Sequence, residues 1–165
     1  MTDAIRLFPG QAEFVSSLES TVGMFTGAGY GKSFTLALKV VQNAIRQNGW
    51  HVGHGGAAES RRLQIIVGAP EQKHLERVTI PYVKQWITDI EQRSGQRLRA
   101  QTGQGKDGWF AAKGSQRQEL LNGVDLLFFP LHSTESAVAT NAAGLAIDEV
   151  TMLPSKDIWL RARQR

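Results

Sequence analysis

The sequence predicts an α/β fold in which a mainly parallel sheet is flanked by helices. Short apolar runs alternate along the chain with longer segments of helical periodicity, as in parallel strands joined by crossover helices. Two of the apolar runs end in polar residues, which in such sheets meet ligands at the carboxyl edge. At 165 residues, we expect one domain over 1–165.

Composition narrows the class of protein. Hydrophobic residues make up 41% and charged residues 21%, as in an ordinary globular chain. The absence of cysteine excludes a disulfide framework and a cysteine-based zinc site. No apolar run approaches the roughly 20 residues of a membrane span, and the N-terminus lacks an apolar signal core, so we expect no membrane partner. The net charge of +4 is compatible with nucleic-acid contact.

The first elements surround a glycine-rich loop. Gln11 to Leu18 has helical spacing and predicts a helix, and Val22 to Phe25 is a short apolar run that predicts a strand. A second helical pattern runs from Lys32 to Gln47, where Asn48-Gly49 supplies C-cap chemistry.

The loop between that strand and that helix, TGAGYGKS, predicts a phosphate-binding P-loop (Walker A). Glycines let backbone amides approach phosphate oxygens, and the helix N-terminus adds its positive dipole end. Lys32 is expected to reach the β- and γ-phosphates of ATP as a catalytic residue, and the Ser33 hydroxyl to bind Mg²⁺. The expected nucleotide-binding residues are Thr26, Gly27, Ala28, Gly29, Tyr30, Gly31, Lys32 and Ser33.

Thr26 departs from the strict pattern, which begins with glycine, so the loop matches only the looser form. The alternative is a glycine-rich turn followed by a chance Lys-Ser. Upstream, Pro9-x-Gln11 suggests an adenine contact, because a Gln amide can read both a donor and an acceptor edge. A helix-capping or surface glutamine is an equal alternative.

The middle of the chain predicts a strand, a long helix and two loops. Arg62 to Gly68 is a buried strand, and a helix is expected from Glu71 to Arg93, kinked or split at Pro81. The glycine-rich segment 50–60 contains His51 and His54 but no further ligand at metal spacing, so it predicts a surface loop. Segment 94–118, around Trp109 and Phe110, is basic; contact with a phosphate backbone and a solvated loop both remain open.

Two further strand features follow. Asn122-Gly123 joins the apolar runs Glu119–Leu121 and Val124–Phe129 and predicts a β-hairpin. Leu145 to Ile147 predicts a short buried strand with Asp148 and Glu149 at its carboxyl end, the Walker B arrangement. Asp148 is expected to hold Mg²⁺ opposite Ser33, and Glu149 to polarise the attacking water as general base.

With both motifs in view, the chain resembles the ATPase domain of the large terminase subunit of tailed bacteriophages over nearly all of its length. The resemblance rests on Pro9-x-Gln11, TGAGYGKS, IIVGAP with the following helix, LLNGVDLLFFP, and AIDEVTMLPSKDIWLRARQR. It implies a RecA-like P-loop NTPase with a β-hairpin insertion, which hydrolyses ATP to move viral double-stranded DNA into a procapsid. The implied partners are a portal protein, a small terminase subunit and further copies in a ring, in the cytoplasm of the bacterial host.

Two departures limit what the resemblance implies. Ala28 stands where many terminases carry an arginine, which leaves Arg161, Arg163 and Arg165 as candidate fingers against the favoured alternative of a solvated helix end. The strand that follows Walker B in related motors, and their nuclease domain, have no counterpart here. We therefore expect a partial domain, poorly stable alone, with weak or no ATPase activity. Another P-loop nucleic-acid motor, such as a helicase or recombination ATPase, and a non-catalytic remnant are the alternatives.

Overall fold

The computed structural model describes residues 6–47, 50–51, 61–100, 109, 117–131 and 142–153. The elements follow the chain in this order: α1 (Pro9–Ser16), α2 (Lys32–Arg46), β1 (Trp50–His51), β2 (Arg61–Ala69), α3 (Gln72–His74), a π-helical turn (Leu75–Thr79), α4 (Ile80–Ser94), β3 (Arg117–Glu119), β4 (Val124–Pro130), β5 (Gly144–Ile147) and a 3₁₀ turn (Val150–Met152).

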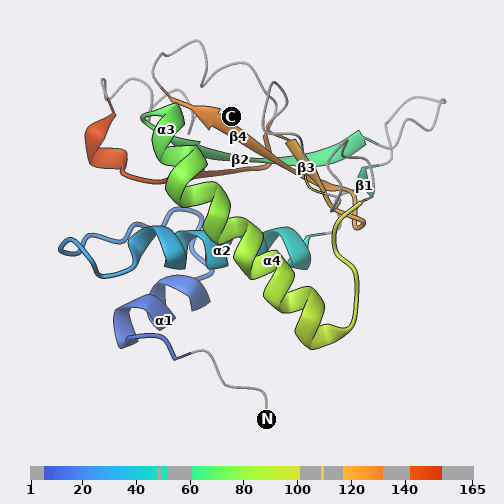
Figure 1. The fold of residues 1–165 in the computed structure, drawn as a ribbon, viewed down its shortest axis with the longest axis horizontal. Helices are drawn as coiled ribbons and strands as arrows, with labels where there is room; N and C mark the ends of the chain where they lie inside the picture. Colours follow the sequence, from blue (N-terminus) through green and yellow to red (C-terminus); the bar gives the residue numbers. More distant parts are fainter. Residues whose placement is uncertain are drawn as a thin grey trace.

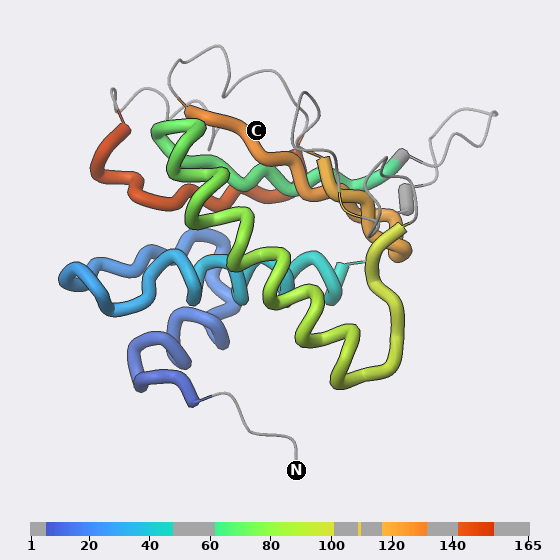
Figure 2. Tube along the Cα trace, in the orientation of Figure 1, coloured from blue at the N-terminus to red at the C-terminus, as the bar shows by residue number. Residues whose placement is uncertain are grey.

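The strands form a mixed sheet whose longest pairs are parallel. β2 pairs in parallel with β4, from Leu63 opposite Val124 onwards, and its other edge pairs in parallel with β5. β3 is antiparallel to β4, and β1 is antiparallel to the start of β2. Figure 1 shows helices α1, α2 and α4 on one side of this sheet, and Figure 2 shows the red segment that contains β5 returning beside β2. The expected α/β class and its sheet flanked by helices are confirmed at this level.

The core fills the space between the sheet and the helices. Alternate side chains of β2 and β4, among them Val67 and Phe128, face α2 and α4. Trp86 of α4 is 1% exposed, and its indole N–H donates to the Phe34 carbonyl of α2 at 3.0 Å. The Phe34 ring lies 4.7 Å from the Trp86 ring, so the helix that follows the glycine loop is fixed against α4.

The predicted hairpin is confirmed. β3 continues through Leu120 into a turn at Asn122-Gly123, where Gly123 has a φ of 81°, and β4 returns antiparallel. A left-handed backbone there suits glycine, which has no Cβ to clash. The Asn122 amide also donates to the Ala44 carbonyl at 2.7 Å, which ties the turn to the end of α2.

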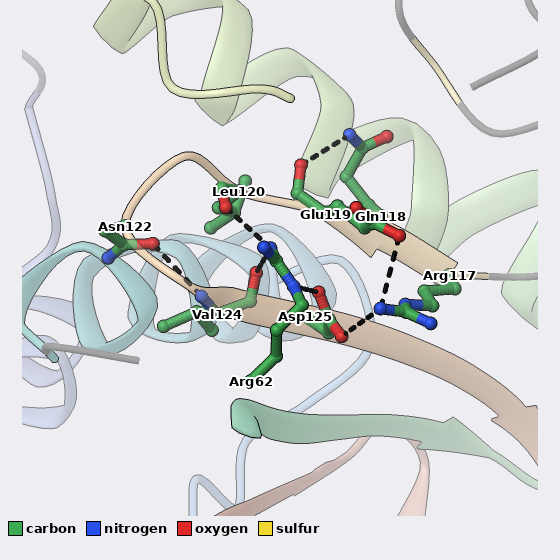
Figure 3. Close-up of polar contacts among 8 residues, drawn as sticks. All are labelled: Arg62, Arg117, Gln118, Glu119, Leu120, Asn122, Val124 and Asp125. Atoms are coloured by element: carbon green, nitrogen blue, oxygen red, sulfur yellow. Dashed lines mark hydrogen bonds and ion pairs between the residues drawn. The ribbon is translucent and has the colours of Figure 1, made fainter. Parts of the chain in front are cut away.

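A buried carboxylate, that of Asp125, stabilises this hairpin close to its turn (Figure 3). Asp125 is fully buried, and the Arg62 Nε donates to its Oδ1 at 2.6 Å. Arg62 also donates to the carbonyls of Leu120 at 2.6 Å and Val124 at 3.2 Å. Arg117 adds an ion pair at 2.7 Å to Oδ2, although not with hydrogen-bond geometry. These contacts lie at the opposite end of β2 from Ala69, so they stabilise the scaffold.

The helix predicted from Glu71 is interrupted, as Pro81 indicated. α3 passes into the π turn, in which the Ile80 N–H bonds to the Leu75 carbonyl, five residues back. Pro81 has no N–H to donate to the Arg77 carbonyl, so an α-helical bond is missing at this place in any case. One turn of the helix is therefore wider, with π-helical hydrogen bonding, and α4 follows it directly.

The predicted strand Val22–Phe25 is wrong. This run is irregular backbone, and the Phe25 side chain is 80% exposed. A strand becomes stable when its N–H and C=O groups pair with a neighbour, and no strand in the described part of the chain pairs with this run. Among the described strands, β5 pairs with β2 alone.

Candidate nucleotide-binding site

The glycine loop has a left-handed backbone at two of its glycines. Gly29 and Gly31 have φ values of 78° and 76°, which L-residues with a side chain rarely adopt. A Cβ at Gly27 or Gly29 would meet no heavy atom within 4 Å, so the loop borders open space. Gly31 is the N-cap of α2, and the first N–H groups of that helix have no partner within it. An anion above this loop would meet free amides and a helix dipole.

Lys32 folds over the loop. Its Nζ donates to the carbonyls of Thr26 at 3.2 Å and Gly27 at 3.1 Å. These are neutral acceptors, and phosphate oxygens make stronger bonds with an ammonium group. The side chain is therefore held near the cradle by contacts that a phosphate can replace.

The two predicted motifs meet in space. The Ser33 Oγ donates to Asp148 Oδ1 at 2.9 Å, although the two residues are 115 positions apart. Ser33 lies in the first turn of α2 and Asp148 follows β5, and the Asp148 N–H bonds to the Gly68 carbonyl of β2 at 2.8 Å. Asp148 is 3% exposed. The hydroxyl and the carboxylate are thus placed together at the carboxyl edge of the sheet.

Glu149 has an unusual backbone. With φ 53° and ψ 46°, it is the only non-glycine residue with positive φ among those the structure describes. Such a conformation costs about 1–3 kcal/mol and is found preferentially at functional sites. Within the described ranges no group hydrogen-bonds to the Glu149 carboxylate.

Gln11 is hydrogen-bonded to the backbone of the glycine loop. It is buried, its amide nitrogen donates to the Tyr30 carbonyl at 2.8 Å, and its oxygen accepts the Phe8 N–H at 3.0 Å. The Phe8 ring stacks on Tyr30 with centroids 5.4 Å apart. Both the oxygen and the nitrogen of the Gln11 amide are thus hydrogen-bonded within the protein, which favours the helix-capping alternative. An adenine contact stays a prediction, and it requires these bonds to be exchanged.

A buried lysine attaches α1 to α2 and so fixes Gln11 against the loop. The Lys39 Nζ donates to the Val15 carbonyl at 2.9 Å and to the Ser17 carbonyl. Burial, and secondarily the positive charge of Arg46, lowers the pKa of Lys39. The two carbonyls that it binds belong to the end of α1, where orphan acceptors need a donor.

Sequence reasoning missed two residues of the site. His74 Nε2 lies 3.0 Å from Asp148 Oδ2, and the Thr79 Oγ1 donates to the same oxygen at 2.9 Å. Both residues were assigned only to a helix. Their spacing of five gives no signal of proximity in an α-helix, and only the nearby proline suggested irregular geometry.

The residues present fit Mg²⁺. Mg²⁺ prefers oxygen ligands and is usually bound through one or two protein groups with phosphates and water completing its shell. Ser33 and Asp148 supply such oxygens. In the part of the chain that the structure describes, no cluster of three or more His, Asp or Glu side chains could hold a metal by itself.

Several predicted features lie outside the described residues: His54, Phe110, Trp159, Arg161, Arg163 and Arg165. No protein-family model matches the chain, and neither does any curated protein or solved structure. None of the helices in the described ranges combines the length and apolar character that crossing a bilayer requires.

Proposed function

We propose that this chain binds ATP with Mg²⁺ at the glycine loop and belongs to a P-loop ATPase. The observation that carries the proposal is the 2.9 Å hydrogen bond between Ser33 and Asp148. A glycine loop with an accidental Lys-Ser has no reason to meet a buried aspartate from a distant strand. The pairing is the one that a shared Mg²⁺ requires.

In this mechanism each residue has a separate task. The loop amides and Lys32 would bind the β- and γ-phosphates. Ser33 and Asp148 would hold Mg²⁺, which would supply positive charge to offset that of the phosphates. Glu149 accepts a proton from a water molecule whose oxygen attacks the γ-phosphorus. The bond to the β–γ bridging oxygen breaks, and ADP and phosphate leave.

The first experiment measures binding of a fluorescent ATP analogue with and without Mg²⁺. Lys32→Ala is expected to weaken binding about 10- to 100-fold, because it removes charged hydrogen bonds to phosphate. The matched control is Arg97→Ala, which removes one positive charge from an exposed position in segment 94–118. Equal loss in both variants, or no Mg²⁺-dependent binding by the unmodified chain, would overturn the proposal.

We further propose that the ATPase drives translocation of double-stranded DNA, as the resemblance to terminase large subunits implies. The support is the sequence of motifs together with the confirmed hairpin ahead of β5. A phosphate-release assay with added DNA distinguishes the alternatives. Stimulation by double-stranded DNA supports a packaging motor, stimulation by single-stranded DNA alone supports a helicase-like motor, and tight binding without turnover supports a non-catalytic remnant.

A further inference from the structure

The two carboxylate oxygens of Asp148 are held by different parts of the fold. Oδ1 accepts from Ser33, which belongs to the glycine loop and α2. Oδ2 is contacted by His74 at 3.0 Å and by Thr79 at 2.9 Å, which flank and end the π turn. The site thus has one oxygen on the nucleotide side and one oxygen fixed by the helix that follows β2.

The π turn brings His74 and Thr79 to the same oxygen. In an α-helix, residues five apart point about 140° away from each other around the axis. In a turn with i→i+5 hydrogen bonds, one extra residue fills the turn, so such residues come close to alignment. The Ile80 N–H to Leu75 carbonyl bond shows this wider turn. Regular α-helix here would separate one of the two side chains from Asp148.

Burying the Thr79 hydroxyl is unfavourable unless it is hydrogen-bonded. Thr79 is fully buried, and its hydroxyl donates to a carboxylate that is itself 3% exposed. A buried donor and acceptor of this kind restrict rotation of the carboxylate. His74 is partly exposed and approaches the same oxygen from the other end of the turn.

We propose that the π turn Leu75–Thr79 positions Asp148 for Mg²⁺, with Thr79 and His74 fixing Oδ2 so that Oδ1 faces Ser33 and the metal. Thr79 and His74 are positioning residues and touch neither nucleotide nor metal. This inference rests on the proposed function, because it concerns the metal of the same site. Residues that orient a metal ligand typically change metal affinity 10- to 100-fold when they are removed.

The experiment titrates Mg²⁺ against binding of the fluorescent ATP analogue. Thr79→Val removes the hydroxyl and keeps the shape, and Thr79→Ser keeps the hydroxyl as the matched control. We expect Thr79→Val to raise the Mg²⁺ concentration at half-saturation at least about tenfold. Thr79→Ser should stay within about threefold of the unmodified chain, and binding in EDTA should be the same for all three.

The outcomes separate this inference from the proposed function. If the unmodified chain binds with Mg²⁺ and Lys32→Ala does not, but Thr79→Val titrates like the unmodified chain, the positioning role is wrong and the nucleotide site stands. If the unmodified chain shows no Mg²⁺-dependent binding, both fall. Should Thr79→Val lose its circular-dichroism signal, His74→Ala takes its place, because His74 is partly exposed, and an unchanged Mg²⁺ titration in that variant overturns the inference.

Discussion

At the scale of single residues, Glu149 differs from its neighbour Asp148 in burial, in side-chain contacts and in backbone conformation. Asp148 is buried and its oxygens are engaged by three side chains, whereas Glu149 is half-buried on a strained backbone. Among the described residues no donor binds the Glu149 carboxylate, so in the proposed mechanism its lone pairs would accept the proton of the attacking water while Asp148 would hold the metal.

We predict that Glu149→Gln abolishes hydrolysis and preserves binding. Glutamine has the same size but accepts no proton, and loss of a general base costs about 10²- to 10⁴-fold in rate. Single-turnover phosphate release would measure the rate, and the fluorescent analogue would measure affinity, which should change less than about threefold. An unchanged rate in Glu149→Gln would assign the base elsewhere, and a parallel loss of binding would indicate a structural role.

At the scale of elements, a partly buried ion pair between Glu91 and Arg99 fixes the segment after α4 to the end of that helix. Glu91 accepts the N–H groups of Leu98 at 2.8 Å and Arg99 at 3.0 Å, and the Arg99 guanidinium binds both of its oxygens. The Arg99 guanidinium also lies 4.3 Å from the centre of the Trp109 ring. Arg99, which contributed to the basic character of segment 94–118, is thus used inside the protein and does not favour contact with a phosphate backbone.

This pair predicts a pH dependence of stability. Burial alone would raise the pKa of Glu91, but the hydrogen bonds from Arg99 and Leu98 outweigh it and lower that pKa. The pair therefore stabilises the fold fully above the ordinary glutamate pKa of about 4.3 and loses that contribution as the pH falls through the lower folded value. Urea unfolding between pH 7 and pH 3 measures the effect. Glu91→Gln should show a flatter decline over the acidic part of this range, and an equal decline in both proteins would contradict the assignment.

Elements with their own periodicity were predictable from the sequence, and elements that depend on a partner were not. The helix starting at Lys32 and the hairpin at Asn122-Gly123 rest on local signals and were found where expected. Val22–Phe25 had equally good local composition, yet pairing decides whether such a run becomes a strand. The contact between Ser33 and Asp148 was predictable, because the two expected motifs would share one Mg²⁺. Thr79 belongs to no recognisable motif, so its contact with Asp148 could not be predicted.

At the scale of the whole molecule, the site joins two halves of the fold. Ser33 belongs to α2, which packs with α4 through Phe34 and Trp86, while Asp148 follows β5 at the carboxyl edge of the sheet. The contact between Ser33 and Asp148 is a single hydrogen bond. A nucleotide held by the loop, with Mg²⁺ between Ser33 and Asp148, would add links between the helical layer and the sheet.

We predict that nucleotide and Mg²⁺ together stabilise the chain against heat, and that neither does so alone. A ligand that binds only the folded state at 100 times its Kd adds about 2.7 kcal/mol. For a chain of this length that corresponds to a rise in Tm of about 5–10 °C. Differential scanning fluorimetry with a non-hydrolysable ATP analogue measures the rise. At the same ligand concentration Lys32→Ala should show a smaller rise, because 10- to 100-fold weaker binding leaves only about 0.4–1.4 kcal/mol. An equal rise in EDTA would mean that the phosphates bind without the metal link, so that Ser33 and Asp148 meet for structural reasons alone.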